Sequence, residues 1–76
     1  MNARRRKDIE DILIKIEDLK SAVENLQIEE EEAFENLPES LQYSERGEKM
    51  QEAASSLEGA VSSLDDVIDY LNTAIE

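Results

Sequence analysis

The sequence predicts an all-α protein: an antiparallel two-helix hairpin with coiled-coil-like packing that dimerises into a four-helix bundle. Apolar residues recur at alternating spacings of three and four in both halves of the chain, which is the period of a helix with one buried stripe. The single proline lies between the two halves, and 76 residues are enough for one domain at most. Residues 1–76 are therefore expected to form one helical-hairpin domain.

The first helix is expected over about residues 4–36. Its apolar stripe occupies heptad positions a and d and comprises Ile9, Ile12, Ile16, Leu19, Val23 and Leu26. Pro38 sets the end of this helix, because proline inside a helix costs about 3 kcal/mol and disfavours helix at the residue before it. The first helix should therefore end near Asn36.

The turn is expected over about residues 37–43 and the second helix over about residues 44–75. Ser44 is a good N-cap, since its hydroxyl can accept a free backbone N–H, and Glu45 suits the positive end of the helix dipole. The second a and d stripe runs without a break through Met50, Ala54, Leu57, Val61, Leu64, Ile68, Leu71 and Ile75. Folding the chain back about Ser40 places stripe against stripe, with Ala33 opposite Gly47 and only Glu30 as a misfit, which is expected to lean toward Lys49.

The apolar face is wider than one hairpin needs. Further apolar residues flank the stripes and are predicted to form a dimer interface: Leu13, Phe34, Ala53, Ala60, Val67 and Ala74. A stripe of three positions in seven is typical of a helix in a larger bundle, so the expected partner is a second copy of the chain. The alternative interpretation is that these alanines are helix-forming residues at half-exposed positions.

The composition excludes several classes of function. Eight Lys and Arg residues face twenty Asp and Glu residues, and a net charge of −12 would repel a phosphate backbone, so no direct binding of nucleic acid is expected. Without Cys or His, the usual zinc, haem and iron–sulfur ligands are missing, and no cofactor or metal is expected. The longest apolar run, Ile12–Ile14, is far too short to span a membrane, and we expect a cytoplasmic protein.

Catalysis finds little support in the sequence. No serine lies in a recognisable nucleophile motif with a base, and a two-helix hairpin offers no pocket in which to shift the pKa of paired carboxylates. We expect a protein that binds rather than an enzyme.

Two groups of residues are candidates for binding another protein. Acidic side chains gather toward the turn, and small side chains with one tyrosine lie on the outer side of the second helix; the candidates are Glu29, Glu31, Glu32, Glu35, Ser55, Gly59, Ser62 and Tyr70. The acidic group could imitate phosphates and occupy a basic groove, and the small residues allow close approach, with Tyr70 as an anchor. The alternatives are a solvated helix face and a neutral surface.

The segment around the turn also resembles a known group of proteins. Asn36-Leu37-Pro38-Glu39-Ser40-Leu41-Gln42, followed by Ser44-Glu45-Arg46 and Glu48-Lys49-Met50, is similar to short acidic helical-hairpin proteins of unknown function in phages, prophages and Gram-positive bacteria. The likeness covers most of the chain, although Gly47 stands where a larger residue is usual. It implies a small protein that binds and modulates a host protein, including an anti-phage defence protein. A structural subunit of a larger particle and an acidic nucleic-acid mimic are the alternatives.

Overall fold

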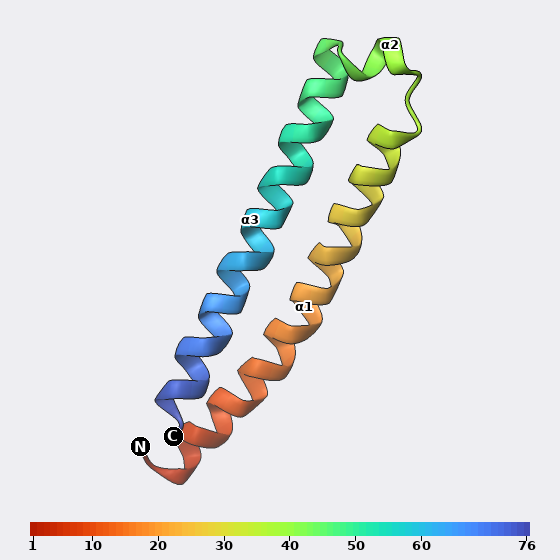
Figure 1. Cartoon of the computed structure of the whole chain (residues 1–76). Helices are drawn as coiled ribbons and strands as arrows, with labels where there is room; N and C mark the ends of the chain where they lie inside the picture. The colour runs from red at the N-terminus through yellow and green to blue at the C-terminus, as the bar shows by residue number, and fades with distance from the viewer.

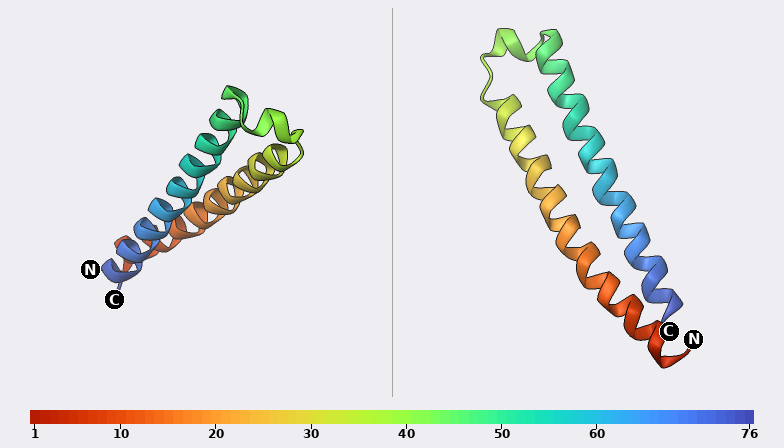
Figure 2. Two further views of the ribbon diagram at one scale, coloured as in Figure 1. Left: turned by 45° about the horizontal axis from the view of Figure 1, so that its top comes forward. Right: turned by 180° about the vertical axis from the view of Figure 1, so that it is seen from behind.

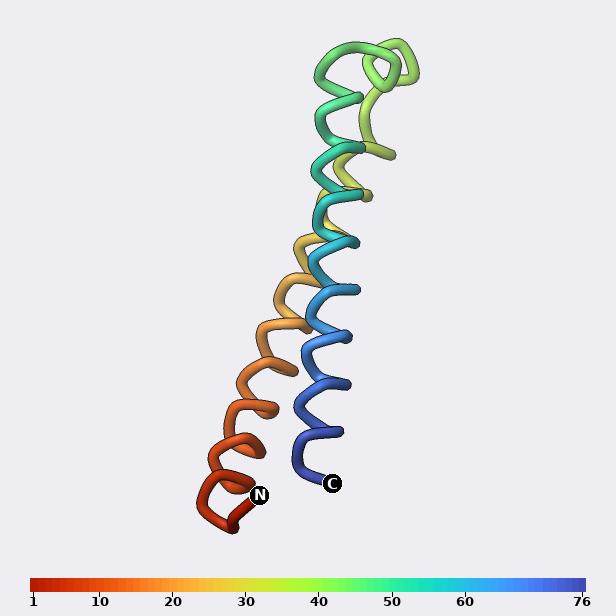
Figure 3. The backbone as a smooth tube through the Cα atoms, turned by 90° about the vertical axis from the view of Figure 1, so that its left-hand side faces the viewer, coloured from red at the N-terminus to blue at the C-terminus, as the bar shows by residue number.

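The chain folds into a long hairpin of two antiparallel helices. The computed structural model describes all 76 residues, with α1 over Ala3–Glu35, a four-residue helix α2 over Glu39–Gln42 in the connection, and α3 over Glu45–Ala74 (Figure 1). The two long helices run side by side in every view, and both termini lie at the end opposite α2 (Figures 2 and 3). The Cα atoms extend over 58 × 15 × 13 Å. The all-helical class predicted from the sequence is confirmed.

The ends of the helices follow local chemistry. The Asn2 side chain accepts a hydrogen bond from the Arg5 backbone N–H at 2.8 Å and caps α1, and α1 ends one residue before Asn36, as Pro38 predicts. Ser44 is the N-cap of α3, where its hydroxyl accepts the Gly47 N–H at 3.4 Å, and Glu45 lies in the first turn.

The connection contains more structure than the sequence predicts. Pro38 starts α2, and the Gln42 side-chain amide then reaches back to the end of α1, donating to the carbonyl of Leu37 at 3.1 Å and to those of Phe34 and Glu35 at 3.4 Å. Phe34 and Glu35 belong to the last turn of α1, where carbonyls lack the usual partner one turn further on, and Leu37 follows directly after the C-cap Asn36. Gln42 thus acts as a side-chain cap on α1.

Gly47 is buried against α2, not against Ala33. A Cβ placed on Gly47 would lie 2.2 Å from the backbone oxygen of Gln42 and 2.7 Å from that of Leu41. The predicted pairing of Gly47 with Ala33 is therefore wrong, because the backbone of α2 occupies the space next to Gly47. Ala33, its expected neighbour, is exposed.

The predicted stripe of α3 forms its inner face. Every one of its members is buried or half-buried: Met50, Ala54, Leu57, Val61, Leu64, Ile68, Leu71 and Ile75. The stripe of α1 is only half right. Positions a face α3 as predicted, but the second inward row is heptad position e, with Leu13, Lys20, Gln27 and Phe34, instead of position d.

The α1 helix is thus rotated about its axis relative to the predicted packing. Its d residues are exposed instead of buried: Ile12, Leu19, Leu26 and Ala33. Glu30 remains on the inner face, half-buried, and Lys49 pairs with Glu45 at 3.3 Å, so the predicted Glu30–Lys49 contact is absent.

Candidate interaction surface

One side of the hairpin carries two exposed apolar rows, which we call the apolar flank. The α1 row is heptad position d, and the α3 row is position g; together they comprise Ile12, Leu19, Leu26, Ala33, Ala53, Ala60, Val67 and Ala74. In an antiparallel pair of helices the g positions of both helices lie on one side and the e positions on the other. Because α1 turns its e row inward, its d row moves to the g side and lies next to the α3 row.

We call the opposite side of the hairpin the polar flank. An ion pair between two e positions on this side supports the placement of the apolar rows on the other side. Lys20 and Asp65, both at position e, pair across the hairpin at 2.5 Å, and Lys20 also lies 3.7 Å from Glu24. The hydrogen bond to Asp65 and the charges of Asp65 and Glu24 raise the pKa of Lys20 above its ordinary value, against a smaller opposing effect of desolvation. This pair compensates Lys20 for its position at the edge of the apolar seam.

The dimer-interface residues expected from the sequence divide between these surfaces. Ala53, Ala60, Val67 and Ala74 lie on the apolar flank as expected. Leu13, only 9% exposed, and Phe34, half-buried, instead face α3 within the hairpin. The apolar residues that α1 offers to another molecule are Ile12, Leu19 and Leu26, because the e row has taken the inner place that the sequence assigned to d.

An open groove of about 360 Å³ on the polar flank brings together some of the predicted binding residues. Glu31 and Glu35 of α1 and Ser55 of α3 line it together with Glu58, which no pattern in the sequence indicates. Glu31 also accepts a hydrogen bond from the Gln27 amide at 3.0 Å. Glu29 and Glu32 are exposed but lie outside this groove, so the acidic residues do not form one site. No group of carboxylates is arranged to hold a metal ion.

The outer residues of α3 are exposed but dispersed. Nothing lies within 4 Å of a Cβ placed on Gly59, and Ser55 and Ser62 face solvent. Tyr70 is 78% exposed and borders a second open groove with Asp66, Asp69 and Thr73. The structure thus separates Tyr70 from the acidic groove near the turn.

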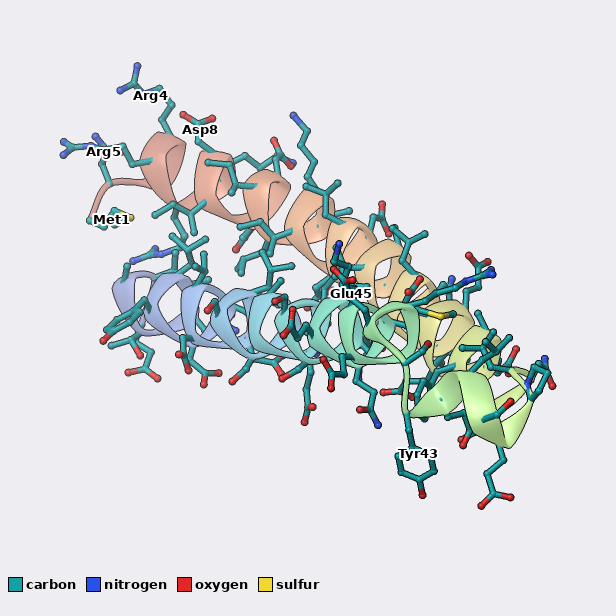
Figure 4. All side chains as sticks on the ribbon, turned by 90° about the horizontal axis from the view of Figure 1, so that it is seen from above. Met1, Arg4, Arg5, Asp8, Tyr43 and Glu45 are labelled. Carbon is teal, nitrogen blue, oxygen red and sulfur yellow. The ribbon has the colours of Figure 1, made fainter.

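None of the four arginines has an ionic partner within the hairpin. Arg4 and Arg5 project away from the terminal end (Figure 4), and Arg46 lies at the start of α3. The four ion pairs of the molecule involve only Lys7, Lys20 and Lys49 as cations, while Arg6 donates to the carbonyl of Ile75 at 3.2 Å. Arg4, Arg5 and Arg46 therefore remain available to another molecule.

The fold and the surface define a helical hairpin with one apolar and one polar flank. Neither long helix contains an apolar stretch that would cross a membrane. Comparisons with protein-family models, curated proteins and solved structures give no match.

Proposed function

We propose that the chain is a non-enzymatic protein-binding module that pairs with a second copy of itself through the apolar flank. The observation that carries this proposal is the orientation of α1. Its d row is wholly apolar, whereas the e row that faces α3 includes Lys20 and Gln27. Burying the d row would remove more apolar surface from water in an isolated hairpin, so the observed orientation favours a second molecule over that row.

The size of the exposed surface supports the same proposal. The hairpin exposes 5607 Å², whereas a compact monomer of 8.6 kDa exposes about 4,700 Å² by the usual scaling with mass. The excess of about 900 Å² is close to the roughly 800 Å² that each partner buries in a standard interface. No side chain in the hairpin is fully buried, so a second layer would supply the core that one hairpin lacks.

A matched pair of substitutions in α1 tests this proposal. Leu19 and Ile14 are 60% and 61% exposed, but only Leu19 lies on the apolar flank. We expect Leu19→Asp to shift the mass measured by light scattering at micromolar concentration from dimer to monomer. Ile14→Asp, which introduces the same charge on the same helix, should leave the dimer intact.

The outcomes are distinct. A wild-type chain that is helical, melts cooperatively and is monomeric at these concentrations would overturn the proposal. Equal effects of Leu19→Asp and Ile14→Asp would show that the flank is not the contact surface. Circular dichroism of both variants checks that the helices persist.

We further propose that the dimer modulates a protein of the host, as the resemblance to phage and prophage proteins implies. The polar flank stays free when the apolar flank is covered, and its acidic groove suits a basic partner. Affinity capture from host lysate tests this proposal when wild type is compared with the triple variant Glu31→Gln, Glu35→Gln and Glu58→Gln. A host protein retained by wild type and lost with the variant is the expected result, and equal retention by both would contradict it.

The acidic groove also favours a second candidate function, imitation of nucleic acid. Glu31, Glu35 and Glu58 hold three carboxylates around one groove, and such a surface would compete with phosphates for a basic cleft. Binding to a nuclease or polymerase should then weaken as salt rises and be displaced by duplex DNA. A variant with the same charge change elsewhere, Glu10→Gln, Glu17→Gln and Asp66→Asn, is the control and should bind as wild type does.

A further inference from the structure

The two rows of the apolar flank differ in size. The α1 row presents the large side chains of Ile12, Leu19 and Leu26, whereas the α3 row is mainly alanine. Helices pack closely when large residues of one lie against small residues of the other, and two rows of large residues hold their helices further apart. The row of large residues on one copy is therefore complementary in size to the row of small residues on a second copy.

The level of each residue along the hairpin decides how the two rows can meet. Two contacts bracket the register: the Arg6 side chain reaches the Ile75 carbonyl, within one residue of the register obtained by folding about Ser40, and Lys20 reaches Asp65, five residues further along α3 than that register places it. Between these limits Leu26 lies at the level of Ala53 to Ala60, Leu19 at the level of Ala60 to Val67, and Ile12 at the level of Val67 to Ala74. If a second copy is rotated by 180° about the long axis, its α3 covers this copy's α1. Leu26 then meets only alanine, and Leu19 and Ile12 each meet one alanine and Val67.

The opposite arrangement, with the turns at opposite ends, lacks this fit. It places α1 on α1 and α3 on α3, because the rotation axis then runs across the hairpin. Leu19 would meet the second copy's Leu19, and Ala60 would meet the second copy's Ala60. One half of the interface would be overfilled and the other half underfilled.

Charges at the edge of the flank favour the aligned arrangement near the turn. Arg46 and Lys49 are the only basic residues among residues 21–76, and both border the α3 row, where they line an open groove of about 440 Å³. On α1, Glu29 and Glu32 border the other row at the same end. The aligned arrangement brings these glutamates against the second copy's Arg46 and Lys49, so opposite charges meet at the edge of the interface.

The terminal end shows the same complementarity. Arg5 continues the α1 row beyond Ile12 and projects away from its own hairpin (Figure 4). At its level, the α3 row ends at Ala74, where the last carbonyls of α3 form the negative end of the helix dipole. In the aligned arrangement Arg5 lies next to this negative end of the second copy.

We propose that two hairpins pair with their turns at the same end, with α1 of each copy packed on α3 of the other. This arrangement rests on the proposed self-association and specifies its geometry. The two contacts between α1 of one copy and α3 of the other are related by one two-fold axis along the hairpin. The assembly is therefore closed, as a four-helix bundle. The polar flanks face outward on opposite sides of the bundle.

A single spin label at the turn tests the arrangement. Tyr43 is 80% exposed and projects from the turn (Figure 4), and the chain contains no cysteine, so Tyr43→Cys gives one labelling site per copy. With the turns at one end, pulsed electron paramagnetic resonance should give a distance between the two labels of roughly 10 to 30 Å, set by helix spacings of 8–10 Å. With the turns opposed, the labels would be about 50 to 60 Å apart, close to the 58 Å length of the hairpin.

These outcomes separate the two proposals. A dimeric mass with the long distance would overturn the aligned arrangement and leave self-association standing. A monomeric mass with no dipolar coupling would overturn both. A dimeric mass with the short distance is the expected result.

A charge reversal with rescue provides an independent measurement. The variant Arg46→Glu, Lys49→Glu should weaken self-association on the order of ten-fold, because like charges then meet at the turn end. Adding Glu29→Lys and Glu32→Lys to the same chain should restore the dissociation constant. The same two lysines at Glu31 and Glu35, on the polar flank, are the control and should not restore it; restoration by this control would overturn the proposed contact.

Discussion

Gly47 and Gly59 both lie within α3, but their surroundings differ. Glycine in a helix interior costs roughly 0.5 to 1 kcal/mol of stability relative to alanine. Each glycine is therefore either required by its surroundings or lowers the stability of the helix. At Gly47 the backbone of α2 occupies the space of a Cβ, whereas at Gly59 that space is open. Gly47 is therefore required by packing, whereas Gly59 is not.

The two glycines form a matched test of this interpretation. Gly47→Ala should lower the free energy of unfolding by about 1 to 3 kcal/mol, since backbone atoms of α2 must move to admit the methyl group. Gly59→Ala should raise it by about 0.5 to 1 kcal/mol through helix propensity alone. Urea denaturation followed by circular dichroism measures both, and a gain in stability at both positions would show that α2 does not pack against Gly47.

Lys20 lies at the edge of the contact between α1 and α3 because the Asp65 carboxylate compensates its positive charge. Its side chain is 27% exposed, so the pair is partly screened by solvent and contributes modestly at neutral pH. The pKa of Lys20 is higher in the folded hairpin than in the unfolded chain. The stabilisation is consequently complete at pH values below the unfolded pKa of about 10.4 and is lost as pH rises through the folded pKa.

Asp65→Asn should therefore lower the pKa of Lys20 toward its ordinary value. Asp65 provides the hydrogen bond that contributes most to the shift, and the remaining charge of Glu24 contributes less. An NMR titration of the Lys20 side chain measures the pKa, with Asp66→Asn as the control on the neighbouring residue. An unchanged pKa in Asp65→Asn would contradict the pair seen in the structure.

At the scale of the elements, α2 holds the two long helices at the turn. It covers Gly47 of α3, and its last residue, Gln42, caps the carbonyls of α1. Four residues bury little apolar surface, so α2 depends on these polar and backbone contacts. We call this connection, residues 36–44, the corner; its contacts limit how the two long helices can rotate relative to each other.

Removing the donor of Gln42 should loosen this corner. Gln42→Glu loses the hydrogen bonds and adds a negative charge at the negative end of α1, and we expect a loss of about 1 to 2 kcal/mol in the free energy of unfolding. Asn25→Asp adds the same charge at an exposed position inside α1 and should change stability far less. Equal losses in the two variants would mean that net charge, and not the cap, accounts for the effect.

At the scale of the whole molecule, the hairpin is long and thin. The radius of gyration is 17.3 Å, whereas a compact domain of 76 residues has about 11 Å. An elongated hairpin leaves most side chains near water, and only Leu13 and Ala54 form its buried apolar core. A second hairpin on the apolar flank would turn that thin layer into a bundle with an interior.

Thermal stability should consequently depend on protein concentration. A dimer gains free energy with concentration, about 2.7 kcal/mol for a hundred-fold increase, and Tm should then rise by roughly 5 to 10 °C. Melting curves recorded by circular dichroism over two decades of concentration measure this rise. The Leu19→Asp variant should show a constant Tm, and a constant Tm in the wild type would contradict dimerisation.

The sequence alone determined the helices, their ends and the inner face of α3. These features depend on local chemistry and on one periodic pattern. Pro38 stops α1, and Ser44 caps α3. No other row of α3 has apolar side chains as large as those of its stripe, so the pattern indicates one inner face. Glu31, Glu35 and Ser55 could also be named from the sequence, although nothing in it joined them with Glu58 in one groove.

Only the tertiary structure decided which row of α1 faces α3. The a row of α1 has apolar neighbours on both sides. Ile12 and Leu19 lie in the d row on one side, and Leu13 and Phe34 lie in the e row on the other. A heptad pattern does not decide whether the helix is rotated to bury a with d or a with e. That choice depends on contacts between residues distant in the chain, including the Lys20–Asp65 pair and the corner that α2 builds around Gly47. The same rotation exposes the d row and so creates the apolar flank from which the proposed function follows.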